Sequence, residues 1–120
     1  MTLTRDARHL ALPQVGAAGQ QRIADGRVLL IGVGGIGCAA AAYLASSGVG
    51  RLTVVDFDTV DETNLGRQVL YAQGHIGELK ADVAAERLCK INPGIDVTPV
   101  NQRLTGEALQ EAVADADVVL

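Results

Sequence analysis

Apolar positions along this chain fall into two alternating patterns. Short apolar runs predict strands at residues 28–33, 52–56, 95–100 and 117–120. The first is apolar throughout, as expected of a strand buried on both faces of a sheet. Segments with helical spacing predict helices at 35–47, 78–91 and 106–114, a short helical stretch near 63–71, and short helices at 3–12 and 17–25. Strands alternating with helices indicate an α/β fold with a parallel sheet and right-handed crossovers.

The first strand runs into the segment Gly32-Val33-Gly34-Gly35-Ile36-Gly37, and a helix rich in small residues follows. Such a strand, glycine turn and helix form a phosphate cradle, because the helix N–H groups and positive dipole end face the anion. We expect Gly32 to permit the turn, Gly34 to let a phosphate approach, and Gly37 to let helix and strand pack closely. The pattern predicts a nucleotide site in a Rossmann-like sheet, with the first strand between the second and fourth and the third outside the second.

Charge, hydropathy and cysteine spacing exclude several function classes. The 120-residue chain has a net charge of −4 and no run of lysine and arginine, which argues against a nucleic-acid partner. Its apolar runs are too short or too interrupted to span a membrane, and the N-terminus lacks a signal-peptide pattern. Cys38 and Cys89 have no C-x-x-C spacing, and His9 and His75 have no partner at metal-ligand spacing. We therefore expect a cytoplasmic protein with buried reduced thiols and no metal site within this chain.

Two acidic residues follow the second strand. Asp56 lies 19 positions after Gly37, where a carboxylate accepts hydrogen bonds from ribose hydroxyls in nucleotide-binding sheets. The other interpretation is an aspartate that caps the strand end, but the glycine turn upstream favours the ribose role. Asp58 could reach a metal-bound phosphate or be a solvated loop acid, and the sequence favours neither.

Further candidates are polar residues that could meet phosphates. If the stretch near 63–71 is helical, Asn64, Arg67 and Gln68 share one face, and the planar donors of an arginine suit a phosphoryl group. Taken alone, a polar outer helix face explains them better. Lys80 lies in the first turn of a helix, against the local dipole, so it either faces a triphosphate or extends into water. By position alone, Arg8 is interpreted as ordinary surface charge.

Several motifs at fixed spacing connect these candidates. Together they resemble the MoeB/ThiF/HesA adenylyltransferases, relatives of the ubiquitin-activating enzymes, and most of all the molybdopterin-synthase adenylyltransferases and their sulfur-carrier relatives. The resemblance covers nearly the whole chain. The segments that carry it are Arg5-Asp6-Ala7-Arg8, Gly32 to Gly37, Val55-Asp56-Phe57-Asp58, Asn64-Leu65-Gly66-Arg67-Gln68, Gly77-Glu78-Leu79-Lys80 and Ile91-Asn92-Pro93.

The resemblance implies an enzyme that binds ATP and Mg²⁺. Such an enzyme attaches AMP to the C-terminal glycine carboxylate of a small ubiquitin-like sulfur-carrier protein and releases pyrophosphate. It also implies residues 1–26 as an N-terminal helical arm and residues 27–120 as the N-terminal part of an ATP-binding, Rossmann-like adenylation domain. The partners implied are the carrier protein and a second copy of the chain.

By position in the family's motifs, the resemblance also implies a role for each candidate site residue. Gly34 and Gly35 line the nucleotide site beside Gly32 and Gly37, and Asp56 holds the ribose. Asn64, Arg67 and Lys80 meet the phosphates, where positive charge stabilises the pyrophosphate leaving group. Arg8 reaches the triphosphate of the neighbouring subunit in a homodimer.

The end of the chain limits this interpretation. The chain stops at apolar residues 118–120, so we expect a sheet truncated after the fourth strand and a fragment that is inactive alone. In the family, the Mg²⁺-binding aspartate follows the fourth strand, and any zinc-binding cysteine pairs lie further on. Both would therefore lie beyond Leu120.

Three other interpretations of the function remain open. An NAD-dependent oxidoreductase shares the strand, the glycine turn and Asp56, but gives Arg67 and Lys80 no role beyond surface charge. Within the family, the activated group could instead be a transfer RNA base carboxamide or a peptide carboxylate. Finally, the chain could be a non-catalytic nucleotide-binding or dimerisation fragment.

Overall fold

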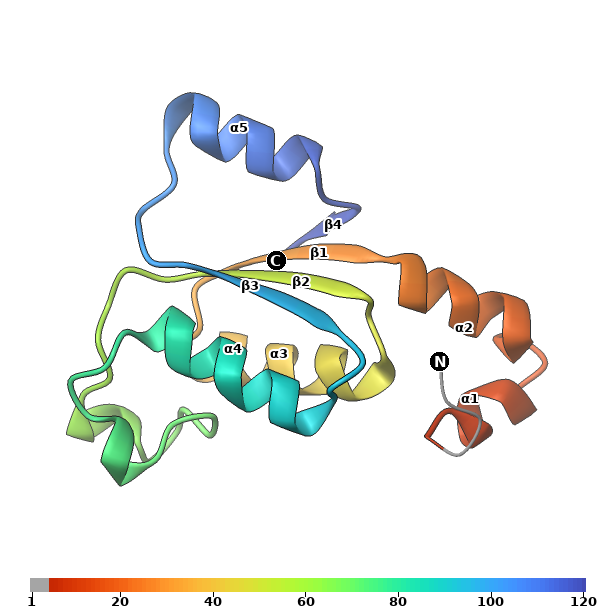
Figure 1. Cartoon of the computed structure of the whole chain (residues 1–120), viewed down its shortest axis with the longest axis horizontal. Helices are drawn as coiled ribbons and strands as arrows, with labels where there is room; N and C mark the ends of the chain where they lie inside the picture. The colour runs from red at the N-terminus through yellow and green to blue at the C-terminus, as the bar shows by residue number, and fades with distance from the viewer. Residues whose placement is uncertain (1–4) are drawn as a thin grey trace.

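The computed structural model describes residues 5–120, and its described residues form a four-stranded parallel sheet in the order β3-β2-β1-β4 (Figure 1). The strands are β1 Arg27–Ile31, β2 Arg51–Val55, β3 Asp96–Val100 and β4 Val118–Val119. Beyond β4, the Leu120 N–H donates to the Leu29 carbonyl, so pairing with β1 continues. The predicted central position of the first strand is confirmed, and so is the Rossmann-like fold.

Helices cover both faces of the sheet. The helices are α1 Ala7–Ala11, α2 Gly16–Asp25, α3 Gly35–Ser47, α4 Lys80–Ile91 and α5 Gly106–Ala114. Figure 1 shows α3 and α4 on one face, α5 on the other, and α1 and α2 beyond the end of the sheet where β1 begins. The carboxyl ends of the strands, where nucleotides bind in such sheets, therefore lie away from α1.

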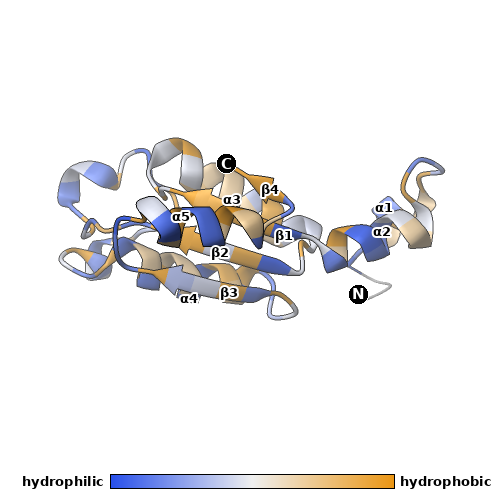
Figure 2. Cartoon of the chain, turned by 90° about the horizontal axis from the view of Figure 1, so that it is seen from above, coloured by the Kyte–Doolittle hydropathy of each residue, from blue (hydrophilic) through white to orange (hydrophobic). Residues whose placement is uncertain are grey.

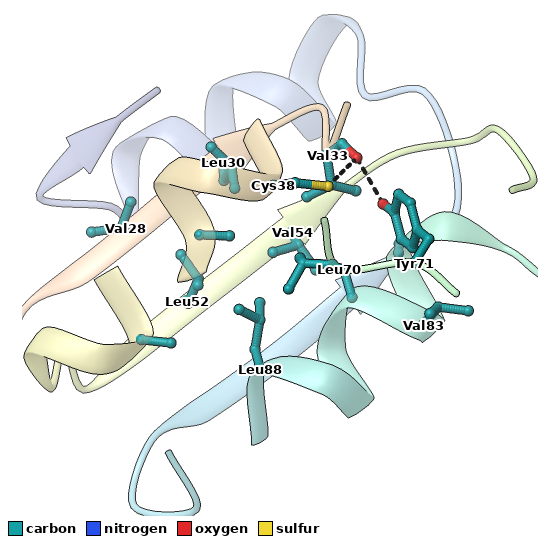
Figure 3. Packing of buried hydrophobic residues seen from close by; sticks show 14 of the residues in the cluster. Val28, Leu30, Val33, Cys38, Leu52, Val54, Leu70, Tyr71, Val83 and Leu88 are labelled. Atoms are coloured by element: carbon teal, nitrogen blue, oxygen red, sulfur yellow. Dashed lines mark hydrogen bonds between the residues drawn. The ribbon is translucent and has the colours of Figure 1, made fainter. Parts of the chain in front are cut away.

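The core lies between the sheet and helices α3 and α4. Leu52 and Leu88 are fully buried there (Figure 3), and burying each leucine side chain contributes about 1.5–3 kcal/mol. Small residues let both helices approach closely; the buried ones are Cys38, Ala41, Ala45, Ala81, Ala84 and Ala85. Figure 2 shows that hydrophobic residues concentrate in strands β1, β2 and β4.

Three predictions from the sequence are wrong in detail. The stretch near 63–71 forms only a short 3-10 helix, η1 Glu62–Asn64, followed by turns, and Gly66 there disfavours a longer helix. A second 3-10 helix, η2 Gln73–His75, comes before α4. Cys89 is exposed, although Cys38 is buried as expected. The first helix is shorter than predicted, and residues 3 and 4 of its predicted range lie outside the described residues.

No helix within residues 5–120 is both long and apolar enough to cross a bilayer.

Candidate nucleotide-binding site

The glycine turn joins the carboxyl end of β1 to the start of α3, and its glycines have different structural roles. Gly32 has φ +94°, a conformation that favours glycine. A Cβ on Gly37 would collide with the Gly32 carbonyl oxygen, so only glycine lets α3 start so close to the strand. Cβ atoms on Gly34 and Gly35 would meet nothing closer than 3.9 and 3.8 Å. A side chain at either position would therefore make ordinary van der Waals contact with Gln68 or Arg67.

Hydrogen bonds fix the turn at Val33 from both sides. The Val33 N–H donates to Asp56 Oδ2 at 3.0 Å. The Val33 carbonyl accepts from Cys38 Sγ at 3.1 Å and from Tyr71 Oη at 2.7 Å (Figure 3). Burial raises the pKa of both Cys38 and Tyr71, so each stays protonated and able to donate. Cys38 is thus a structural thiol and not a nucleophile.

Asp56 follows β2 and is only partly buried. Its Oδ1 accepts from the Asp58 N–H at 2.8 Å, while its Oδ2 accepts from Val33. The carboxylate therefore holds the local backbone, as the strand-capping interpretation predicts. Each carboxylate oxygen has lone pairs for more than one donor, so the same group can also receive ribose hydroxyls. Asp58 itself is exposed, and its carbonyl accepts from the Lys80 N–H at 2.9 Å.

A pocket of about 450 Å³ opens beside Asp56 at the carboxyl ends of the strands. It lies among the end of β1, the end of β2 and the segment that follows β3. Its lining residues are Ile31, Gly32, Val55, Asp56, Phe57, Asp58, Arg103, Leu104 and Thr105. Such a volume is in the range of small-ligand sites.

One wall of this pocket carries a contact that the sequence analysis missed. The Arg103 guanidinium lies over the Phe57 ring, 5.1 Å from its centroid, which is within cation–π distance. The only sequence signal was the position of Arg103 after the third strand, because ligands bind beyond the carboxyl ends of strands.

Arg67 and Gln68 lie against the glycine turn, although the helix predicted for them is absent. The aliphatic part of Arg67 lies beside Gly35, and Gln68 Nε2 lies beside Gly34. Asn64 is buried, and its Oδ1 accepts from the Asp61 N–H at 2.9 Å. Asn64 and Gln68 are buried while Arg67 is exposed. The shared face was expected only for a helical stretch, and the chain has no helix over these three residues.

Lys80 is the first residue of α4 and is only 6% exposed, so the alternative of a lysine extending into water is wrong. Among residues 5–120, no carboxylate lies within ion-pair distance of its amine. Its charge still acts on two neighbours. It adds to the lowering of the Asp61 pKa, which comes mainly from hydrogen bonds with Thr63, and it opposes the raised pKa of Cys38. A buried cation without an ion-pair partner is well suited to an anionic ligand.

Arg8 does not join these residues within one chain. It is exposed on α1, at the end of the sheet where β1 begins. The described residues also contain no group of three or more histidine, cysteine or acidic side chains that could hold a metal ion. The chain thus brings together the glycine turn, Asp56, Arg67, Gln68 and Lys80, but not Arg8.

Comparisons with known proteins identify the family of this chain. The sulfur carrier protein ThiS adenylyltransferase of Escherichia coli (strain K12) is 48% identical over 116 residues, which cover 97% of this chain and 46% of that protein. The molybdopterin-synthase adenylyltransferase of Salmonella typhimurium is 44% identical over 118 residues, covering 98% and 47%. The E. coli tRNA N6-threonylcarbamoyladenosine dehydratase TcdA, solved in complex with AMP, superposes with a TM-score of 0.88 at 34% identity, covering 98% and 47%.

The chain spans about half the length of the curated relatives it matches. The family model described as the ThiF family matches residues 7–120, and the chain belongs to that family.

Proposed function

We propose that the protein containing this chain uses ATP to adenylate the C-terminal glycine carboxylate of a small ubiquitin-like sulfur-carrier protein, releasing pyrophosphate. The observation that carries this proposal is the arrangement around the glycine turn. A pocket opens next to Asp56, Arg67 and Gln68 lie against the turn, and the buried Lys80 begins α4 and acts electrostatically on Cys38. An oxidoreductase would need the pocket and Asp56, but would give the buried cation no role.

The geometry suits the chemistry of adenylation. The substrate carboxylate attacks the α-phosphorus of ATP, and the bond from that phosphorus to the oxygen bridging it to the β-phosphate breaks. Negative charge then builds on the departing pyrophosphate, where Lys80 and Arg67 stabilise it. Asp56 binds the ribose, and the pocket lined by Phe57 and Arg103 receives the adenine ring.

Mg²⁺ is expected to accompany ATP and to neutralise triphosphate charge. Residues 5–120 supply no cluster of ligands for it, so this set of residues does not fit a complete metal site.

The choice of substrate follows from the relatives. Those at 48% and 44% identity are named for adenylating a sulfur carrier and molybdopterin synthase, whereas TcdA at 34% identity is named for acting on a transfer RNA. The higher identity supports a carrier-protein tail. We also propose residues 1–26 as an arm and residues 27–120 as the first part of the ATP-binding domain.

We propose a homodimer in which Arg8 serves the partner's site. Helix α3 carries apolar residues on every side, and Ile36 and Tyr43, which lie two turns apart, are 90% and 79% exposed. Exposed large apolar residues on one helix face are typical of a protein interface. A two-fold contact would use the same surface on both copies and create two equivalent sites.

The decisive measurement is ATP–pyrophosphate exchange by the full protein. We expect exchange with a sulfur-carrier protein that ends in glycine, none with the same carrier lacking that residue, and ATP binding much tighter than NAD binding. Exchange stimulated only by a transfer RNA or a free peptide would replace the proposed substrate. NAD binding without ATP binding would refute the proposal.

Asp56→Ala is expected to weaken ATP binding by about 1.5–3 kcal/mol, because charged hydrogen bonds to the ribose are lost. Asp56 also accepts hydrogen bonds from the Val33 and Asp58 N–H groups, so Asp56→Asn is a second variant that disturbs the local backbone less. Calorimetric titration measures the ATP affinity of both variants, and thermal melting measures their stability. Asp25→Ala, on α2 at the opposite end of the sheet, is the matched control. Unchanged ATP affinity in a folded Asp56 variant would remove this residue from the site.

A further inference from the structure

Helix α1, which carries Arg8, has little of its own to hold it in place. It has five residues, Ala7–Ala11, and none of them is buried. A helix this short is unstable alone in water. It packs mainly against α2, and the two helices lie together beyond the end of the sheet (Figure 1). Contacts with α2 therefore set the orientation of α1.

Helix α2 is itself fixed to the body of the domain. The Gly50 N–H donates to the Ile23 carbonyl at 3.2 Å, and the Arg51 N–H donates to the Gly26 carbonyl at 3.1 Å. A Cβ on Gly50 would collide with the Ala24 carbonyl oxygen, so only glycine allows this close approach. The segment that leads into β2 therefore holds the end of α2, and α1 is attached to a fixed support.

One side chain of α2, Gln20, joins α1 to the end of α3. Gln20 is only 1% exposed, and its Nε2 donates to the Ser47 carbonyl at 3.1 Å. Because a carbonyl oxygen can only accept, the nitrogen of the carboxamide faces Ser47 and its oxygen faces His9. Gln20 Oε1 and His9 Nδ1 lie 2.7 Å apart, so Nδ1 carries the proton and donates. The carboxamide thus bridges two elements and uses both of its ends.

His9 is the neighbour of Arg8 on α1, so this bridge acts on the helical turn that carries Arg8. Placement matters for such a group, because a displacement of about 1 Å can lower a rate about 10²-fold. We propose that Gln20 is a positioning residue, which holds α1 against the body of the domain and thereby places Arg8 for its role at the partner's site. The inference rests on the proposed function for that role.

The test is a double-mutant cycle on ATP–pyrophosphate exchange by the full protein. Gln20→Met keeps the length of the side chain and removes both hydrogen bonds, and we expect kcat to fall about 10- to 100-fold. In the Arg8→Ala background, the same change should lower kcat less than about twofold, because a residue that acts only through Arg8 then has nothing to position. Gln21→Met is the control and should leave kcat unchanged, since Gln21 is exposed and bonds only Asp25 on its own helix.

His9→Phe is a second variant that leaves the buried Gln20 side chain in place. It keeps a ring, removes the donor to Gln20 Oε1, and should reproduce the loss of kcat and its dependence on Arg8. Equal losses with and without Arg8 would show that Gln20 only supports the fold. Unchanged exchange in a folded Gln20→Met protein, or in Arg8→Ala alone, would also overturn the proposal.

Amide hydrogen exchange gives a measurement that is independent of activity. In Gln20→Met, the amides of α1 should exchange faster, whereas those of β1 and β2 should keep their wild-type rates. Unchanged rates in α1 would contradict the proposal. If no carrier supported pyrophosphate exchange while α1 alone exchanged faster, the proposed function and the role of Arg8 would fail, but the attachment of α1 through Gln20 would stand.

Discussion

Lys80→Met should lower ATP–pyrophosphate exchange about 10²- to 10³-fold, the loss typical of removing one donor to a developing anion. Lys80 begins α4, is almost fully buried and has no carboxylate partner among residues 5–120. Its charge is therefore available for the phosphates, and it matters most when the pyrophosphate leaves. ATP affinity should fall much less than kcat, because only interactions stronger in the transition state accelerate the chemical step. Methionine retains most of the aliphatic stem, so the change isolates the charge.

Arg67→Ala should act in the same direction, with a smaller effect because this side chain is exposed. Lys90→Met is the matched control, since Lys90 lies on the same helix, is exposed and pairs with Glu86. Exchange kinetics give kcat and KM, and calorimetry gives the ATP affinity independently. If kcat stayed constant while ATP affinity fell by the full amount, Lys80 would serve ground-state binding and not the transition state.

The sheet was predictable because each strand is a short segment rich in β-branched or aliphatic residues, and helical segments and turn residues separate the strands. Helix α3 has the predicted bounds, since it begins in the glycine turn and ends before Gly48, whose φ of +90° closes it. The strand order followed from the position of the glycine turn in nucleotide-binding sheets. Local pattern and a general rule of topology were enough for these features.

The stretch near 63–71 was not predictable, because tertiary contacts determine it. Polar residues at helical spacing suggested a shared face, but the Asn64 side chain closes a capping box with Asp61. Further along, Tyr71 donates to a carbonyl 38 positions upstream. No local pattern reveals such a pairing, and it is this contact that positions Gln68 against the turn. The contact between Arg103 and Phe57 could not be predicted for the same reason, because Arg103 follows β3 whereas Phe57 follows β2.

Arg8→Ala should also lower exchange by at least about 10²-fold, although Arg8 lies far from the turn in its own chain. Helix α1 lies beyond the start of β1, whereas the glycine turn lies at the other end of that strand. A direct role for Arg8 therefore requires a second copy. The exposed α3 face with Ile36 and Tyr43 provides a surface for one.

Heterodimers separate a trans role from a cis role. In a heterodimer of an Arg8→Ala chain and a Lys80→Met chain, a trans arginine leaves one complete site, so we expect about half of the wild-type exchange. In the reciprocal heterodimer, a wild-type chain is paired with a chain carrying both changes, and a trans arginine then leaves no complete site. A cis arginine predicts the opposite pair of results. Two affinity tags purify each heterodimer, and exchange is measured before the subunits remix. Activity confined to the second heterodimer would place Arg8 in its own chain's site and contradict the arrangement proposed here.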